Sequence, residues 1–147
     1  MRRIVVVLAL VLVMVPTVAQ AGWIDSRTKT FTTVLHMWQD HRDYAHNLQR
    51  MGHSSSLASQ ACAQARRMAA RGSIYHNKIV PVGTWAWLGQ VVGVVTAGKG
   101  TAPLFQAYHN SIPHRLAWQY PGANLVGDCA YLADGKWWHV ANMEQRV

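Results

Sequence analysis

The chain has 147 residues, with 14 lysines and arginines against six acidic residues and a formal net charge of +8. This length suits a single domain with one core. The basic residues are scattered and form no lysine- or arginine-rich run, which argues against a nucleic-acid-binding protein.

The first 21 residues are typical of a secretory signal peptide. Two arginines after Met1 precede an apolar run too short to span a bilayer comfortably, and Ala19–Ala21 match the small-x-small cleavage pattern. We expect cleavage after Ala21 and a secreted or periplasmic mature chain, Gly22–Val147, without a transmembrane segment. Its 12 basic and six acidic residues give a net charge of +6. The alternative is an uncleaved membrane anchor, which Pro16 and the small residues after it disfavour.

The first helix is expected over Thr28–Met51, with Gly52 as its C-terminal stop. Apolar residues recur there at helical spacing, namely Phe31, Val34, Leu35, Trp38, Leu48 and Met51. The segment also carries three histidines at five-residue steps, His36, His41 and His46. On a 3.6-residue period each step turns the side chain by about 140°, so we expect no shared face and no metal-binding pair.

A second helix is expected to begin at the serine run Ser54–Ser56, whose side chains suit an N-cap, and to end at Gly72. Its apolar stripe is narrow and consists mainly of small residues, Leu57, Ala61, Ala65, Met68 and Ala69. Such a stripe lets a helix lie close against a sheet or another helix. His76 follows the end of this helix by four residues.

Weaker signals follow in the middle of the chain. Lys78–Thr84 is expected to be a loop, and Trp85–Val95 is a strand or a buried segment, because periodicity alone does not distinguish the two. Thr101–Asn110 is expected to be a helix with Pro103 in its first turn. Its inward residues would be Leu104, Ala107 and Tyr108. Pro113 is expected to exclude a regular helix through His114.

The chain closes with a β-hairpin signal. Asp134-Gly135 separates two apolar and aromatic runs, and this dipeptide favours a tight hairpin turn. Trp137 and Trp138 are neighbours in the second run. Since successive side chains of a strand alternate, one tryptophan is expected to face the core and the other to face outward.

The two cysteines, Cys62 and Cys129, are expected to form one disulfide, because an exported chain meets an oxidising compartment. Closing a loop of nearly seventy residues contributes about 4 kcal/mol on the chain-entropy model. The bond would join the second helix to the first strand of the hairpin. The alternative is a pair of buried free thiols, which a reducing cytosol would favour.

Several short segments match one known family in order. The pattern from Leu57 to His76 resembles a helix that ends in the family's first histidine, and Gly89–Val92 resembles its Gly-Glu-Asn-Ile box. Tyr108–Arg115 resembles its Trp-x2-Ser-x2-His-Arg box. Leu125–Gly127 and Trp137-Trp138 resemble its final hairpin. On these segments the chain resembles the CAP superfamily of cysteine-rich secretory, antigen 5 and pathogenesis-related proteins, in its short bacterial, SCP-like form.

The resemblance implies an α+β fold, an α/β/α sandwich with a central antiparallel sheet, in one domain over residues 22–147. The family's cavity typically holds two histidines and two acids, and some members bind zinc or another divalent ion there. The positions carried over are His76 and His114, with Gln90 at an acid position. Here the chain departs from the family, because the glutamine amide is uncharged and is no general base.

No carboxylate is evident for this cavity. The only glutamate of the mature chain, Glu144, is expected beyond the hairpin, and no aspartate lies between Ile74 and Gly127. No cofactor is therefore expected, and zinc would have only His76 and His114 as ligands, fewer than the three protein ligands usual in catalytic sites. If the two histidines are close, one should titrate below its ordinary pKa.

We expect a non-catalytic ligand- or surface-binding module. Its groove would be lined by His76, Gln90, Tyr108, Ser111 and His114 together with Trp85, and its partner would be a small ligand, a lipid, a cell-wall component or a protein. One alternative is a metal-assisted hydrolase or cell-wall-active enzyme, with Ser111 as nucleophile and His114 as base. Another is a structural surface protein with a vestigial site, which makes contacts through the hairpin tryptophans.

Overall fold

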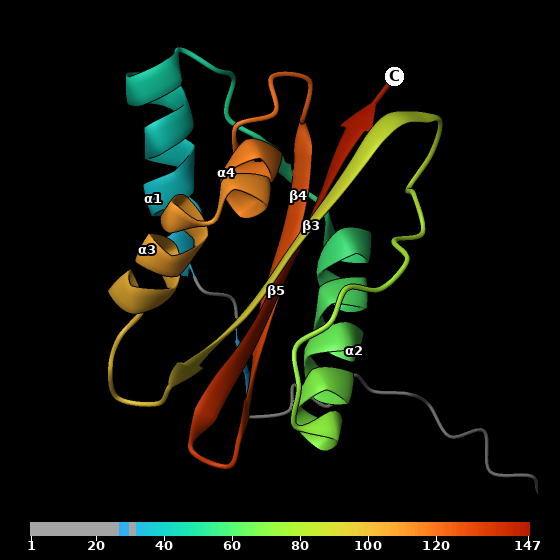
Figure 1. Cartoon of the computed structure of the whole chain (residues 1–147). Coiled ribbons are helices and arrows are strands. Elements are labelled where there is room, and N and C mark those ends of the chain that lie inside the picture. Colours follow the sequence, from blue (N-terminus) through green and yellow to red (C-terminus); the bar gives the residue numbers. More distant parts are fainter. Residues whose placement is uncertain (1–26, 30–31) are drawn as a thin grey trace, which may run out of the picture.

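Three long strands form the centre of the molecule (Figure 1). The computed structural model describes residues 27–29 and 32–147, so the expected signal peptide lies outside the described residues. The strands are β1 (Thr28–Lys29), β2 (Gly52–His53), β3 (Trp85–Thr96), β4 (Leu125–Ala133) and β5 (Lys136–Arg146). The helices are α1 (Thr32–Asp40), which continues as a π-helical turn η1 (His41–Ala45), α2 (Ser55–Arg71), α3 (Ala102–Asn110) and α4 (Ile112–Trp118).

The sheet has the order β1-β4-β5-β3, with antiparallel neighbours, and the short β2 pairs with β4 in parallel. The β4–β5 hairpin turns at Asp134 and Gly135, as predicted. Both residues have positive φ, 50° and 67°, which is the conformation that a two-residue hairpin turn requires. Among the described residues, strand β3 pairs with β5 alone and therefore forms one edge of this sheet.

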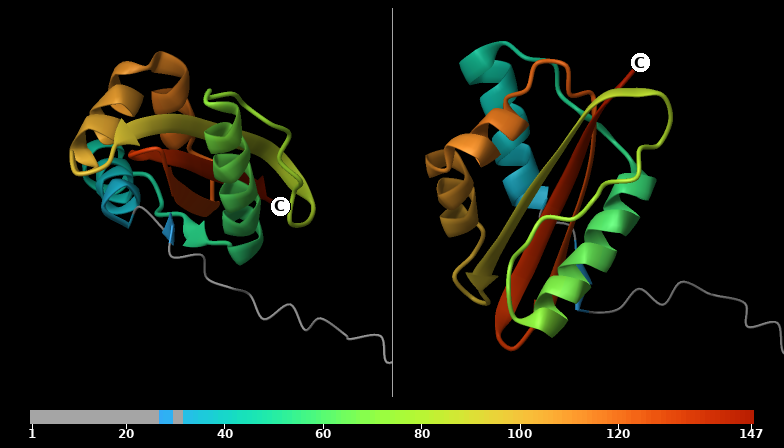
Figure 2. Two further views of the ribbon diagram at one scale, coloured as in Figure 1. Left: turned by 90° about the horizontal axis from the view of Figure 1, so that it is seen from below. Right: turned by 45° about the vertical axis from the view of Figure 1, so that its right-hand side comes forward.

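Helix α2 covers one face of the sheet, and α1, α3 and α4 cover the other (Figures 1 and 2). Each face has its own core: one forms between the sheet and the three helices, around Trp38 and Trp118, whose rings stack at 5.4 Å. The other forms between the sheet and the small-residue stripe of α2. The predicted α+β, α/β/α sandwich is confirmed. Within the described residues, no helix has both the length and the apolar character needed to cross a bilayer.

The signals at the two ends of α2 are also confirmed. The Ser54 hydroxyl accepts a hydrogen bond from the Leu57 backbone N–H at 3.3 Å, as an N-cap does. Gly72 ends the helix with a φ of 70°, a conformation that costs glycine little. The stripe residues Leu57, Ala61, Ala65, Met68 and Ala69 are all buried.

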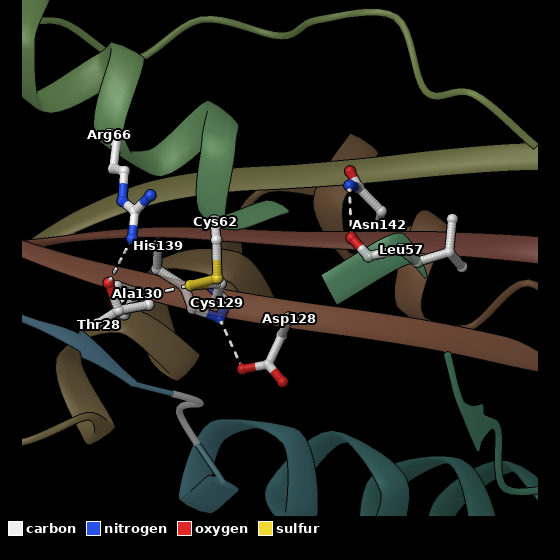
Figure 3. Close-up of a disulfide and its surroundings, with 9 residues drawn as sticks. All are labelled: Thr28, Leu57, Cys62, Arg66, Asp128, Cys129, Ala130, His139 and Asn142. Atoms are coloured by element: carbon white, nitrogen blue, oxygen red, sulfur yellow. Dashed lines mark hydrogen bonds and ion pairs between the residues drawn. A yellow bond between two sulfur atoms is a disulfide. The ribbon is translucent and has the colours of Figure 1, made fainter. Parts of the chain in front are cut away.

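The predicted disulfide between Cys62 and Cys129 is present and joins α2 to β4 (Figure 3). The Cα atoms of the two residues are 4.9 Å apart, and 67 positions separate them in the sequence. Because the bond lies between the helix and a central strand, it holds α2 against the sheet.

The helix predicted over Thr28–Met51 is wrong at both ends. It begins at Thr32 and ends at Ala45, and Gly52 lies in β2 instead of stopping a helix. Side chains of the helix capture the backbone beyond it. Both the N–H and the carbonyl of Met51 bond to the amide of Gln39, at 3.0 and 2.8 Å, which holds residues 47–51 in a non-helical path.

The expectation that His41 and His46 lie on different faces is also wrong. Their Nε2 atoms are 3.2 Å apart. The expectation assumed 3.6 residues per turn, whereas η1 is a wider π-helical turn with i→i+5 hydrogen bonds, and the helix ends directly after it. His36, further back on α1, is exposed and does not join them.

Three further expectations need correction. His114 is helical, because α4 begins at Ile112 and places Pro113 in its first turn, where the missing N–H does no harm. Ala107 is exposed, although Leu104 and Tyr108 are buried as expected. The two hairpin tryptophans lie on opposite faces of the sheet as expected, but neither faces outward: Trp138 is buried in the core beneath α2, and Trp137 packs half-buried against the other core with the Lys29 ammonium 4.1 Å from its ring centroid.

Candidate functional site

The two histidines singled out in the sequence meet beside the edge strand β3. His76 comes from the segment after α2, and His114 from the first turn of α4, and their ring centroids are 5.8 Å apart. The Tyr108 ring contacts His114 edge-on at 5.2 Å. The expectation that His76 and His114 converge is confirmed. Their role in binding stays a prediction.

Gln90 of β3 orients His76. The Gln90 Oε1 atom accepts a hydrogen bond from the backbone N–H of Asn77 at 2.9 Å, which identifies it as the oxygen, since an N–H cannot donate to an NH₂ group. The same oxygen lies 3.2 Å from His76 Nδ1, so this nitrogen must carry the proton and donate. In neutral His76, Nε2 is then the nitrogen with the free lone pair.

The other end of the Gln90 amide is equally fixed. Its Nε2 donates to Asn142 Oδ1 at 2.8 Å, and Asn142 Nδ2 donates to the Leu57 carbonyl at 3.2 Å (Figure 3). A chain of amides therefore runs from the start of α2, through β5 and β3, to His76. The Gln90 oxygen accepts two hydrogen bonds and its amide nitrogen donates one, all to neighbouring residues, so Gln90 is a positioning residue.

Two cavities adjoin Gln90. One, of about 200 Å³, lies between α2 and the sheet. Its lining includes Gln60, Gln64, Arg67, Lys78, Gln90 and Asn142. The other, of about 510 Å³, opens along the sheet edge and is lined by Lys78, Ile79, Pro81, Trp85, Leu88 and Gln90, with Asn77. Lysine and arginine line these cavities, and no carboxylate of the described residues does.

The segment that forms the outer wall, Lys78–Thr84, is held by its backbone. Val80 donates its N–H to the Gln60 side-chain oxygen and accepts from the Gln60 amide nitrogen, both at 2.8 Å. Val82 donates its N–H to Glu144 Oε2 at 2.9 Å. Glu144 is fully buried within β5, so its expected place beyond the hairpin is wrong.

Ser111 and Trp85 lie apart from the contacts that join the histidine pair. Ser111 sits between α3 and α4 and its side chain caps neither helix. In the part of the chain that the structure describes, no hydrogen bond joins its hydroxyl to His114, and its backbone carbonyl accepts from Arg115 N–H at 2.9 Å. Trp85 is half-exposed and lines the larger cavity beside Gln90.

A buried polar chain behind His114 was missed by the sequence analysis. The Asp128 carboxylate accepts from His139 Nε2 at 3.4 Å, and the Tyr108 hydroxyl lies 2.8 Å from His139 Nδ1, to which it donates whenever that nitrogen carries no proton. Burial, and then Asp128, raise the pKa of Tyr108 well above its ordinary value, so the hydroxyl stays protonated. The chain fixes the Tyr108 ring against His114. Only the two-residue alternation of the strands hinted that Asp128 and His139 point to the same side.

The site does not fit a catalytic zinc centre. Among residues 27–29 and 32–147, no three histidine, cysteine, aspartate or glutamate side chains are grouped to hold an ion. The position of a third ligand is taken by Gln90, whose oxygen already accepts two hydrogen bonds. His76 and His114 alone fall short of the three protein ligands usual in such centres.

Acidification is expected to destabilise the protein through His114. Burial, and then the neighbouring His76, lower the pKa of His114 below its ordinary value of 6.5. As the pH falls through 6.5, the unfolded chain gains a proton that the folded chain takes up only at lower pH, so the free energy of unfolding falls. Above pH 6.5 the His114 ring is increasingly neutral in both the folded and the unfolded chain, so its contribution to the pH dependence of the free energy of unfolding vanishes.

Urea unfolding at pH values of about 7.5 and 5 checks this expectation. His114→Asn should lose less stability on acidification than the wild type. His41, whose pKa is also lowered by burial and by its cationic neighbours, acts in the same direction and should account for part of the remaining loss. Equal losses in wild type and variant would contradict the assignment to His114.

Sequence comparison finds no matching family model and no matching curated protein. Comparison of structures does find similar folds. An outer surface protein of Borrelia burgdorferi has a TM-score of 0.66 at 16% identity, over 79% of this chain and 92% of that one. A cysteine-rich secretory protein of Staphylococcus aureus has a TM-score of 0.54 at 14% identity, over 79% of this chain and 38% of that one. The Schistosoma mansoni venom allergen-like protein 4 has a TM-score of 0.58 at 11% identity, over 78% of this chain and 84% of that one.

The architecture and the residues at its sheet edge define an α/β/α domain with a polar site where the two helical layers meet beside β3. Its structural relatives include SCP-domain proteins, among them an extracellular protein of Bacillus anthracis with a TM-score of 0.57 at 14% identity, over 78% of this chain and 41% of that one. The chain has the CAP fold, as the resemblance in the sequence implied.

Proposed function

We propose that the chain is an exported, non-catalytic binding module whose cavities at the sheet edge take a small amphipathic anion. The observation that carries the proposal is the position of Gln90, which contacts His76 and lines both cavities. A carboxylate there would repel an anion and could serve as a base, whereas the amide does neither.

The chemistry of the ligand is inferred from the cavity walls. Ile79, Pro81, Trp85 and Leu88 offer the larger cavity an apolar surface suited to an acyl or aromatic group. Lys78 lines both cavities and Arg67 the smaller one, so the polar end of the ligand faces two cations. A fatty acid or another lipid with an anionic end has both properties.

The same geometry disfavours the hydrolase alternative. A nucleophilic serine needs a base within hydrogen-bond reach, and Ser111 and His114 share no such bond in the described part of the chain. His76 Nδ1 is committed to Gln90, and no carboxylate bonds to either histidine of the pair among the described residues.

Export is supported by the disulfide and by structural neighbours described as extracellular, and is tested by N-terminal sequencing of the secreted protein.

Dodecanoate binding, measured by isothermal titration calorimetry, tests the proposed function. We expect saturable binding by the wild type, and at least tenfold weaker binding by Lys78→Ala because the cation facing the carboxylate is lost. Lys99→Ala is the matched control, since Lys99 is exposed in the turn after β3, and it should bind like the wild type. Dodecanol, which lacks the charge, should not distinguish wild type from Lys78→Ala.

Two results would overturn the proposal. One is the absence of dodecanoate binding to the folded wild type, which would favour a structural protein with a vestigial site. The other is an equal loss of affinity in Lys78→Ala and Lys99→Ala, which would indicate non-specific attraction to a basic protein.

A further inference from the structure

Three side chains from distant parts of the sequence converge on the three-helix face, away from the cavities. They are His41 in η1, His46 just after it, and Gln119 at the end of α4. The two imidazole Nε2 atoms are 3.2 Å apart, and the amide nitrogen Nε2 of Gln119 lies 3.0 Å from each of them. The three polar atoms thus form a nearly equilateral triangle.

Hydrogen bonds cannot satisfy all three contacts of this triangle at once: if the Gln119 NH₂ group donates to both imidazoles, the His41–His46 contact joins two acceptors. Each contact needs one donor and one acceptor, but an imidazole Nε2 is one or the other at a given moment, and so is each end of an amide. Three such atoms in mutual contact always leave at least one pair of two donors or two acceptors. This holds for every protonation state of the histidines and for both orientations of the Gln119 amide.

A metal ion at the centre would resolve the conflict, because all three atoms would then direct lone pairs at it. Turning the Gln119 amide by 180° presents its oxygen without moving the side chain. Ligands bound tetrahedrally at about 2.0–2.1 Å lie about 3.3 Å from one another. The observed separations of 3.0 to 3.2 Å are close to this value.

We propose that His41, His46 and Gln119 form a surface site for a divalent transition metal, separate from the His76–His114 pair. Imidazole ligands suit zinc, copper and nickel, and the lack of a carboxylate ligand disfavours calcium and magnesium. Among the described residues, no third histidine, cysteine, aspartate or glutamate completes the set, so the amide oxygen is the third ligand and water takes the open position.

The surroundings of the site are cationic but keep His41 in its ligating form. Burial, and then His46, His109 and Arg115, lower the pKa of His41, so the neutral ring predominates at neutral pH. The site is accessible, since His46 is exposed and His41 is partly so. An ion there would link the end of the first helix to the end of α4 and stabilise the folded state by mass action.

Zinc titration of the untagged protein tests this site. In a His76→Ala/His114→Ala background we expect one equivalent of Zn²⁺ by calorimetry and a rise in Tm with added zinc. Adding His46→Ala should weaken binding at least tenfold. Gln119→Glu should strengthen it at least tenfold, because a carboxylate replaces an amide of the same shape. His36→Ala, which removes an exposed histidine of the same helix, is the control and should bind as its background does.

Circular dichroism verifies that each variant folds, and if the double background does not fold, the comparison is made between wild type and His46→Ala, with a difference of one equivalent expected. The proposal is overturned if the folded background binds no Zn²⁺, if His46→Ala leaves the affinity unchanged, or if His36→Ala weakens binding equally. His36, His46 and Gln119 do not line the cavities beside Gln90, and dodecanoate binding is measured on the wild type, so a failure of the zinc proposal leaves the proposed function standing.

Discussion

Replacing Arg42 with leucine is expected to lower the free energy of unfolding by about 3–5 kcal/mol. Arg42 is fully buried beneath η1, and its guanidinium donates five hydrogen bonds to four backbone carbonyls. Two go to Gln49, and one each to Trp118, Tyr120 and Ala123, at 2.7 to 3.0 Å. Leucine would remove these donors. The Tyr120 carbonyl would still accept from the Ala123 N–H at 3.2 Å, and each buried carbonyl left unpaired costs about 1–3 kcal/mol.

Urea unfolding of Arg42→Leu, Arg42→Lys and Arg50→Leu measures this effect. Lysine keeps the charge but has a single donor group, so it cannot reproduce the planar fork and should recover only a minority of the loss. Arg50 is half-exposed and pairs with Asp40 at 2.9 Å, and its loss should change stability by about 1 kcal/mol at most. An Arg42→Leu protein within about 1 kcal/mol of the wild type would show that these bonds contribute little net stability.

Gly127→Ala is expected to be nearly as damaging, at about 3 kcal/mol or more. A Cβ atom at Gly127 would lie 2.1 Å from the Ala58 nitrogen, 2.5 Å from the Leu57 carbonyl carbon and 2.6 Å from the Ser54 oxygen. All three are backbone atoms at the start of α2, so no side-chain rotation relieves the overlap. The helix must move away from β4, although the Cys62–Cys129 disulfide holds it there.

Gly52→Ala is the matched control for this substitution. A Cβ atom at Gly52 would meet its nearest neighbours at 3.6 Å, an ordinary contact, and Gly52 lies in β2, which is itself paired with β4. Its effect should stay within about 1 kcal/mol. Thermal unfolding of the two variants with the disulfide intact gives the Tm values to be compared. A Tm for Gly127→Ala equal to that of Gly52→Ala would mean that α2 shifts at little cost.

The parts of the fold that local signals determine could be predicted from the sequence. The Asp134-Gly135 turn, the Ser54 cap and the Gly72 stop each depend on residues within a few positions of one another, and all three are present. The pairing of Cys62 with Cys129 followed from the even cysteine count, which leaves a single possible intramolecular bond.

Features that depend on distant backbone could not be predicted. In the sequence Arg42 is one more charged residue of an amphipathic helix, and its burial depends on carbonyls of residues 118–123. The early end of that helix has the same origin, since Gln39 and Arg42 bond the backbone of residues 49 and 51. Helical periodicity carries no information about such long-range bonds.

The candidate site was predictable in part. The family resemblance brought His76, Gln90 and His114 together, and the structure places them in contact or near-contact. The bonds of the Gln90 amide and the buried Asp128–His139 pair had no local signal, because each depends on the strand register. The contact between His41 and His46 was missed because the helix was assumed to be a regular α-helix.

The wall segment Lys78–Thr84 is attached to the rest of the molecule by the main-chain atoms of Val80 and Val82, whose partners are Gln60 and Glu144. Apart from the buried side chain of Ile79, its placement therefore depends little on which side chains it carries. The segment can be rewritten while its anchors stay the same, much as a hypervariable loop is grafted onto an unchanged framework. A library randomised at positions 78 and 81, with the buried Ile79 kept, would then yield folded proteins with new ligand preferences, and the domain would serve as a scaffold for engineered recognition.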